Sequence, residues 1–196
     1  MRGPNIKPLP VAPELNDSLD LPVILTLGSN VTTDEIMPAG AQILPLRSNV
    51  PAISEYVFHK IDPQFAAKAK ELKQSVIVAG QNYGQGSSRE HAALAPMYLG
   101  VRIVLAQSFA RIHRANLLNF GIVPLTFVRE EDLKRIRAGS ILRFTGLHQA
   151  IQAAEPFSVV LDNETEPILV RHDFSEREAR ILLAGGLLNA TKAAAV

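Results

Sequence analysis

A glycine-rich turn that carries two serines and an arginine is the part of this sequence best suited to chemistry. Ser87, Ser88 and Arg89 lie where the turn that follows a short apolar run at 76–79 meets the start of a helical pattern at 88–99. Backbone N–H groups left unpaired at a helix start, together with the positive end of the helix dipole, favour an anion or a developing oxyanion. An arginine beside them can bind a carboxylate through two parallel hydrogen bonds. The turn is therefore predicted to bind a small carboxylate or phosphate.

The same turn allows two other interpretations. Ser87 and Glu90 have the spacing of a capping box, which stabilises a helix start and needs no function. A dinucleotide-binding loop would carry its third glycine where Arg89 stands, and no Walker lysine follows, so the residues argue against a nucleotide site. Gly84 and Gly86 leave the backbone open to a ligand, which favours a binding site over simple capping. A serine acts as a base only when its alkoxide is stabilised, and backbone amides with a neighbouring cation can do that.

Two more segments carry polar residues of interest. Thr32 and Glu35 form a second capping-box pattern, and Asp34 falls in the first turn of that predicted helix. Arg47 stands in a loop rich in turn formers, where an isolated arginine is usually solvated unless a partner site lies nearby. His91, one turn into the helix at 88–99, is expected to pack or to form hydrogen bonds. The five histidines show no metal-ligand spacing.

The composition excludes several classes of protein. The 196 residues include 20 basic and 19 acidic side chains, and a net charge of +1 argues against nucleic-acid binding and against an anionic membrane surface. The absence of cysteine excludes disulfides, thiolate zinc sites and iron–sulfur ligation by this chain. No apolar run approaches the about 20 residues needed to span a bilayer, and the first residues lack the apolar core of a signal peptide. We therefore expect a soluble, cytoplasmic protein.

The apolar pattern predicts an α/β fold with a mainly parallel central sheet flanked by helices. Strands at 76–79, 101–106 and 122–127 alternate with helices, the order typical of parallel sheets. A first strand is expected at 23–27. Ligands in such folds bind beyond the carboxyl ends of the strands, where the serine turn falls. Apolar segments in the last third of the chain add a C-terminal β layer, at 141–144, 157–161 and 168–170.

The remaining segments are assigned from prolines, caps and periodicity. Four prolines within the first thirteen residues predict an extended linker over 1–21, which leaves the folded domain at 22–196. The tail after 190 is expected to fray. Helices are predicted at 52–58, 65–72, 88–99, 109–119 with Ser108 as its cap, 130–138 and 175–184.

Four stretches of the sequence resemble the C-terminal swivelling domain of the aconitase superfamily. They are TTDEIMPAG at 32–40, LPLRSN at 44–49, NYGQGSSREHAAL at 82–94 and SFARIHRANLLNFGIVPLTF at 108–127. The resemblance covers nearly the whole chain from about Pro22 onward, and the Gly-Ser-Ser-Arg-Glu-His string is highly specific to this superfamily. It implies a swivelling β/β/α domain of a hydro-lyase that interconverts citrate and isocitrate through cis-aconitate, a tricarboxylic acid.

The resemblance also implies roles for individual residues. The first serine of the string is the catalytic base in this family and falls on Ser87, whereas Ser88 and Arg89 fall on the positions that bind a substrate carboxylate. Arg47 falls on the loop arginine that holds another carboxylate. Asp34 falls on an active-site aspartate.

In the family a 4Fe-4S iron–sulfur cluster is held by cysteines of other domains. Since this chain has no cysteine, the cluster is expected on partner domains or on a large subunit, and the chain alone is predicted to be inactive. Glu35 stands where many members have histidine, and Gln85 stands where isopropylmalate isomerase small subunits often have cysteine, which favours aconitase. The alternatives are a small subunit of isopropylmalate or homoaconitate isomerase and an RNA-binding regulatory module.

Overall fold

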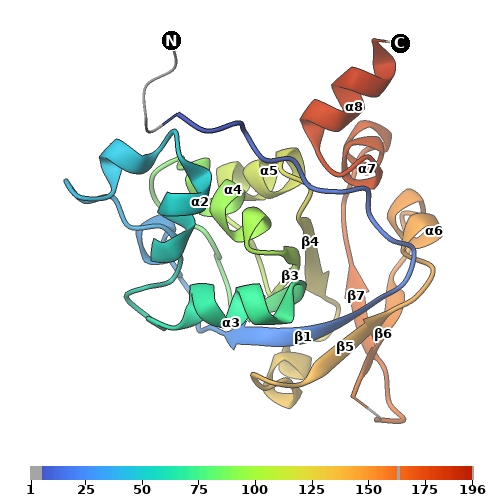
Figure 1. Cartoon of the computed structure of the whole chain (residues 1–196). Helices are drawn as coiled ribbons and strands as arrows, with labels where there is room; N and C mark the ends of the chain where they lie inside the picture. Colours follow the sequence, from blue (N-terminus) through green and yellow to red (C-terminus); the bar gives the residue numbers. More distant parts are fainter. Residues whose placement is uncertain (1–5, 163, 196) are drawn as a thin grey trace.

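The strands of this protein close into one barrel. The computed structural model describes residues 6–162 and 164–195, and within them seven strands are hydrogen-bonded in the order β1-β2-β3-β4-β7-β6-β5 (Figure 1). The strands are β1 (Leu19–Thr26), β2 (Ser75–Ala79), β3 (Val101–Ala106), β4 (Val123–Phe127), β5 (Ile141–Phe144), β6 (Phe157–Leu161) and β7 (Ile168–Arg171).

The prediction of a mainly parallel sheet with a separate C-terminal β layer is wrong, because all seven strands of the described ranges belong to one closed barrel. The pairs β1–β2, β2–β3 and β3–β4 are parallel, as expected, but the other four pairs are antiparallel. β1 closes the ring, since Val23 pairs with Val76 of β2 and Leu19 pairs with Phe144 of β5. Closure gives both edges of the parallel half a partner, which removes the unpaired backbone groups of an open sheet.

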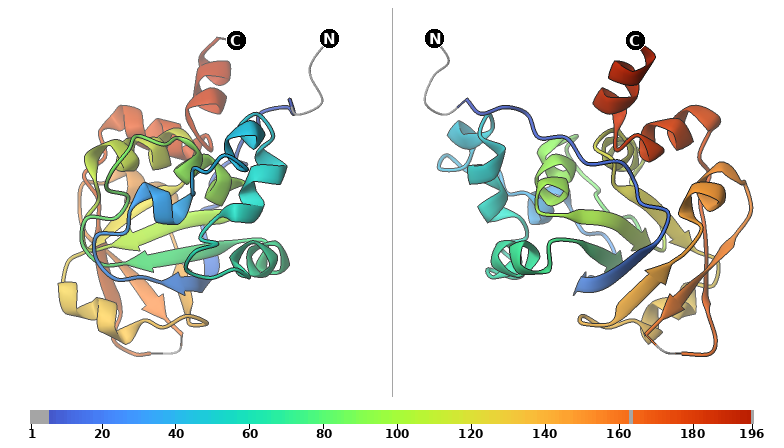
Figure 2. Two further views of the ribbon diagram at one scale, coloured as in Figure 1. Left: turned by 90° about the vertical axis from the view of Figure 1, so that its left-hand side faces the viewer. Right: turned by 45° about the vertical axis from the view of Figure 1, so that its right-hand side comes forward.

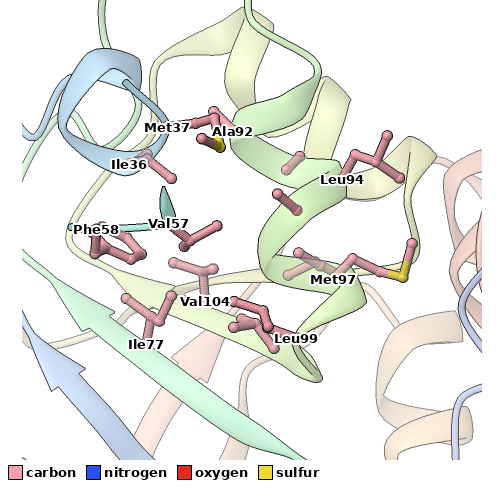
Figure 3. Close-up of a cluster of buried hydrophobic side chains, with 14 of the residues drawn as sticks. Ile36, Met37, Val57, Phe58, Ile77, Ala92, Leu94, Met97, Leu99 and Val104 are labelled. Atoms are coloured by element: carbon pink, nitrogen blue, oxygen red, sulfur yellow. The ribbon is translucent and has the colours of Figure 1, made fainter. Parts of the chain in front are cut away.

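Helices from the first two thirds of the chain cover one side of the barrel and enclose a second core, whereas Leu147 and Leu182 of two later helices pack with the barrel interior. In the parallel half, Val76 and Val78 point into the barrel interior, whereas Ile77 between them packs against the helices. Figure 3 shows Ile77 and Val104 facing the apolar side of α4. Burial on both faces explains the apolar runs 76–79 in β2 and 103–106 in β3. The helices are α1 (Thr33–Ile36), α2 (Val50–Ile53), α3 (Phe65–Leu72), α4 (His91–Tyr98), α5 (Arg111–Asn119), α6 (Leu147–Gln152), α7 (Glu176–Leu183) and α8 (Leu187–Ala194), with 3-10 turns at Leu44–Leu46, Ser54–Tyr56 and Glu130–Arg135.

Several helix predictions need correction. The helix predicted at 88–99 begins at His91, so its N-cap is Glu90 rather than Ser87 and the predicted capping box does not form. The Glu90 side chain accepts no hydrogen bond from the helix backbone. Ser108 does not cap α5 either, since its hydroxyl accepts the backbone N–H of Asn82. The segment predicted as a helix at 130–138 is a shorter 3-10 turn, and α8 occupies most of the tail that was expected to fray. The helix at 65–72 is confirmed.

Residues 6–18 form an extended strap along the outside of the molecule (Figures 1 and 2). Ala12 and Leu15 of the strap are buried. The strap is fixed from two distant elements, because Arg102 Nη2 donates to the carbonyl of Pro13 at 3.0 Å and Asn189 Nδ2 donates to that of Ala12 at 2.9 Å. The division between a linker at 1–21 and a domain at 22–196 stays a prediction, although β1 begins at 19. None of the helices in the described ranges has the length and apolarity needed to cross a membrane.

Candidate active site

The serine turn lies between β2 and α4, and two glycines give it its path. Gly84 and Gly86 have φ values of +82° and +101°, which L side chains rarely adopt. At Gly84 the turn also passes very close to α5, since an added Cβ would lie 2.1 Å from Cδ2 of His113. The turn is therefore an irregular loop that precedes the helix rather than the first turn of the helix. Its position at the end of a parallel strand agrees with the prediction.

Both serines of the turn are exposed and keep their hydroxyls free within the described part of the chain. The backbone of Ser87 is held, because Thr33 Oγ1 donates to its carbonyl at 2.9 Å. Ser87 and Ser88 line a cavity of about 200 Å³ together with Arg89 and Arg111. A hydroxyl beside two cations is in a suitable place to lose a proton or to bind an anion.

Arg89 is fixed by an aspartate that lies 55 residues earlier in the chain. Its Nη1 donates to Asp34 Oδ1 at 2.6 Å and to the carbonyl of Met37 at 3.2 Å. The other oxygen of Asp34 accepts from Lys60 Nζ at 2.6 Å. No residue that the structure describes is hydrogen-bonded to Nη2 or Nε of Arg89, so these groups can bind a ligand through a two-point contact.

The two cations keep Asp34 ionised. Lys60 first, and Arg89 second, lower the pKa of Asp34 to about 2 by hydrogen bonding, against a smaller opposing effect of burial. A carboxyl group with this pKa carries no proton at neutral pH, so Asp34 is suited to positioning Arg89 and unsuited to proton donation. Asp34 lies in α1, whose predicted capping box of Thr32 and Glu35 is confirmed.

Arg47 lies across a second, open groove from the serine turn. This groove of about 310 Å³ is lined by Arg47, Ser88 and Arg89, and by apolar residues that include Met37 and Ile43. Arg47 is exposed at the end of the 3-10 turn Leu44–Leu46, and its guanidinium forms no ion pair with any described residue. The structure thus brings the predicted binding residues to two adjoining cavities that share Ser88 and Arg89.

Two residues beside this site gave no recognisable signal in the sequence. Lys60 reaches Asp34 from 26 residues away, and no local pattern relates the two. His113 is buried below the turn, with its ring 5.3 Å from that of Tyr83, and desolvation lowers its pKa to about 4. Only the fold shows that both residues support the serine turn.

The chain offers no ligand set for an iron–sulfur cluster. It contains no cysteine, and across 6–162 and 164–195 no group of three or more histidine, aspartate or glutamate side chains is arranged to hold a metal ion. The residues present therefore do not fit a cluster bound by this chain. The side chains that line the two cavities include the hydroxyls of Ser87 and Ser88 and the guanidinium groups of Arg47, Arg89 and Arg111.

Comparison with known proteins identifies relatives over much of the chain. The profile of the Aconitase C-terminal domain family matches residues 54–130. A putative mitochondrial aconitate hydratase from Emericella nidulans is 36% identical over 208 residues, which cover 92% of this chain and 26% of that protein. A mitochondrial homocitrate dehydratase from Saccharomyces cerevisiae is 38% identical over 120 residues, 58% of this chain and 15% of that protein. The chain thus spans about a quarter or less of the length of these relatives.

A solved structure matches at nearly full length. The crystal structure of 3-isopropylmalate dehydratase from Methanocaldococcus jannaschii has a TM-score of 0.72 and 32% sequence identity, and the match covers 90% of this chain and 96% of that one. The expectation of a cytoplasmic protein is wrong by these comparisons, because both curated relatives named above are mitochondrial proteins. That expectation rested on the missing membrane-spanning run and the missing signal-peptide core, and neither absence distinguishes the cytoplasm from other compartments.

Proposed function

Because the chain belongs to the aconitase family, as the C-terminal swivel domain of that superfamily, we propose that it is the substrate-binding and proton-abstracting part of an aconitate hydratase. The substrate is then citrate or isocitrate, interconverted through cis-aconitate. The observation that carries the proposal is the meeting of Arg47, Ser88 and Arg89 on one groove, with the free hydroxyl of Ser87 beside it. A tricarboxylic acid requires a separate cationic side chain for each carboxylate that the site binds.

Each residue has a distinct part in this proposal. Arg89, held at Nη1 by Asp34, presents Nη2 and Nε to one carboxylate, and Arg47 binds another from the opposite wall. Ser87 removes the proton from the carbon next to a carboxylate, and the cations around it stabilise its alkoxide. Two fixed carboxylates leave the substrate little freedom to rotate, so the C–H bond stays at Ser87.

The other half of the reaction belongs to a partner. We propose that the 4Fe-4S cluster is carried by cluster-bearing domains upstream or by a large subunit, since this chain has no ligands for it. The chain spans only about a quarter or less of the length of its curated relatives, which supports a cluster carried outside this chain. The chain alone is then a folded domain that binds and orients the acid but does not turn it over.

The decisive experiment is Ser87→Ala in the assembled enzyme. We expect kcat to fall by about 10²- to 10⁴-fold with little change in KM, because a base acts in the transition state. Ser88→Ala is the matched control, since it removes the same hydroxyl from the next residue and is expected to raise KM. A Ser87→Ala enzyme with near-normal kcat would refute the role of Ser87 as the base.

A second substrate class within the same reaction is favoured by two of the relatives. The homocitrate dehydratase is similar to this chain in sequence, and the 3-isopropylmalate dehydratase is similar in fold and in sequence. They differ from aconitate hydratase in the side chain of the acid that they accept. Competition among citrate, homocitrate and isopropylmalate on the assembled enzyme separates the alternatives, and we expect citrate or isocitrate to give the highest kcat/KM.

A further inference from the structure

A single side chain connects the two loops that carry the substrate-binding arginines. His91, the first residue of α4, follows the serine turn directly, and its Nε2 lies 2.8 Å from the backbone carbonyl oxygen of Arg47. A carbonyl oxygen can only accept a hydrogen bond, so Nε2 of His91 carries the proton. His91 also lines the groove of about 310 Å³ that separates the two loops.

The loop that holds Arg47, residues 40–48, has few other contacts that could fix it. Its 3-10 turn has no side-chain cap and no buried residue, although Ile43 and Leu46 pack partly against the core. Among the described residues, two hydrogen bonds reach this loop from distant segments: the one from His91, and one from the N–H of Lys7 in the strap to the carbonyl of Ser48 at 2.9 Å. The bond from His91 is the one made at Arg47 itself.

We propose that His91 is a positioning residue, which holds Arg47 at a fixed distance from Ser88 and Arg89 and so sets the spacing of the two carboxylate-binding loops. The proposal rests on the proposed function. It differs from direct substrate binding, because His91 acts through the backbone of Arg47. One N–H donor on Nε2 is sufficient for this role.

The test is a pair of substitutions in the assembled enzyme. His91→Leu removes the donor, and we expect KM to rise by about 2- to 12-fold with kcat nearly unchanged, the range that corresponds to one ordinary hydrogen bond. His91→Gln keeps an N–H donor of similar reach and is expected to restore most of the affinity. Equal KM values for His91→Leu and the unaltered enzyme would overturn the proposal.

An Arg47→Ala background separates positioning from direct contact. If His91 acts through Arg47, His91→Leu no longer raises KM once the guanidinium is gone, because the two substitutions share one effect. If the same rise in KM persists there, His91 binds the acid itself and the proposal is wrong.

Hydrogen exchange tests the hydrogen bond from His91 to the carbonyl of Arg47, here called the bridge, without any turnover. In the chain alone, the backbone amides of residues 40–48 are expected to exchange about 2- to 12-fold faster in His91→Leu and at the original rate in His91→Gln. Unchanged exchange in His91→Leu would overturn the bridge even if the enzyme proved to be an aconitate hydratase. Conversely, faster exchange together with an Arg47→Ala enzyme of normal KM would refute the proposed function and leave the bridge in place.

Discussion

Replacement of Gly84 by alanine tests how the serine turn is held against α5. The residue has a φ of +82°, and the added Cβ would lie 2.1 Å from Cδ2 and 2.5 Å from Cβ of His113. The left-handed backbone costs an L residue about 1–2 kcal/mol. Overpacking against a buried ring adds about 1–3 kcal/mol, because the Cβ of His113 cannot move without α5. We therefore expect Gly84→Ala to lower the free energy of unfolding by about 2–5 kcal/mol.

Gly86→Ala is the matched control for this substitution. Its φ is +101°, but an added Cβ meets no heavy atom closer than Thr33 Oγ1 at 3.7 Å. Only the backbone cost of about 1–2 kcal/mol remains. Urea unfolding of the two variants and the unaltered chain gives both values, and the difference between the variants measures the contact with His113. If the two variants lose the same stability, the close approach of the turn to α5 is not real.

Three further predictions concern the charged groups and the partner. Arg89→Lys should raise KM by about 10-fold or more, because one ammonium cannot bind both Asp34 and a substrate carboxylate. Urea unfolding should show a change of only about 0–1 kcal/mol in the free energy of unfolding. An unchanged KM would remove Arg89 from the site. Asp34→Asn should lower stability by at most about 1 kcal/mol, because the carboxylate is 43% exposed. The pKa of Asp34 in the folded chain is about 2, below its usual 3.8. The stability difference between the unaltered chain and Asp34→Asn should therefore be constant above pH 3.8 and vanish as the pH falls through 2. A stability difference that grows in acid would contradict the lowered pKa of Asp34. The purified chain should be folded, colourless and without hydratase activity, which absorption spectra and an assay with cis-aconitate can check; turnover by the metal-depleted chain would refute the need for a partner.

The strands could be located from the sequence, but their pairing could not. Apolar runs at 141–144 and 157–161 mark β5 and β6 with the bounds that the structure gives. Nothing in these runs indicates that β1 pairs with β5 as well as with β2. Pairing across more than a hundred residues depends on twist and on the fit of the interior, and neither leaves a local pattern.

The capping boxes show a similar limit. Thr32 forms its box with Glu35 as the spacing predicts, and α7 begins with a further box formed by Ser175 and Glu178. Ser87 has the same spacing and forms no box, because the N–H of Arg89 turns back to the carbonyl of Ser87 and the helix begins only at His91. The resemblance to a known family proposed Asp34 and Arg89 as site residues, and only the fold shows that they form an ion pair.

The closed barrel has a consequence for synthesis on the ribosome. β4 obtains its second neighbour only when β7, the last strand of the chain, pairs Val170 with Phe127. Until then a nascent chain carries an open parallel sheet whose inner face, including Val78 and Leu105, is uncovered. Such edges and apolar faces bind other chains readily, and slow long-range pairing extends the time of exposure. Chains released before residue 168 are therefore expected to depend on chaperones or to be degraded, whereas loss of α8 alone leaves the ring of strands intact.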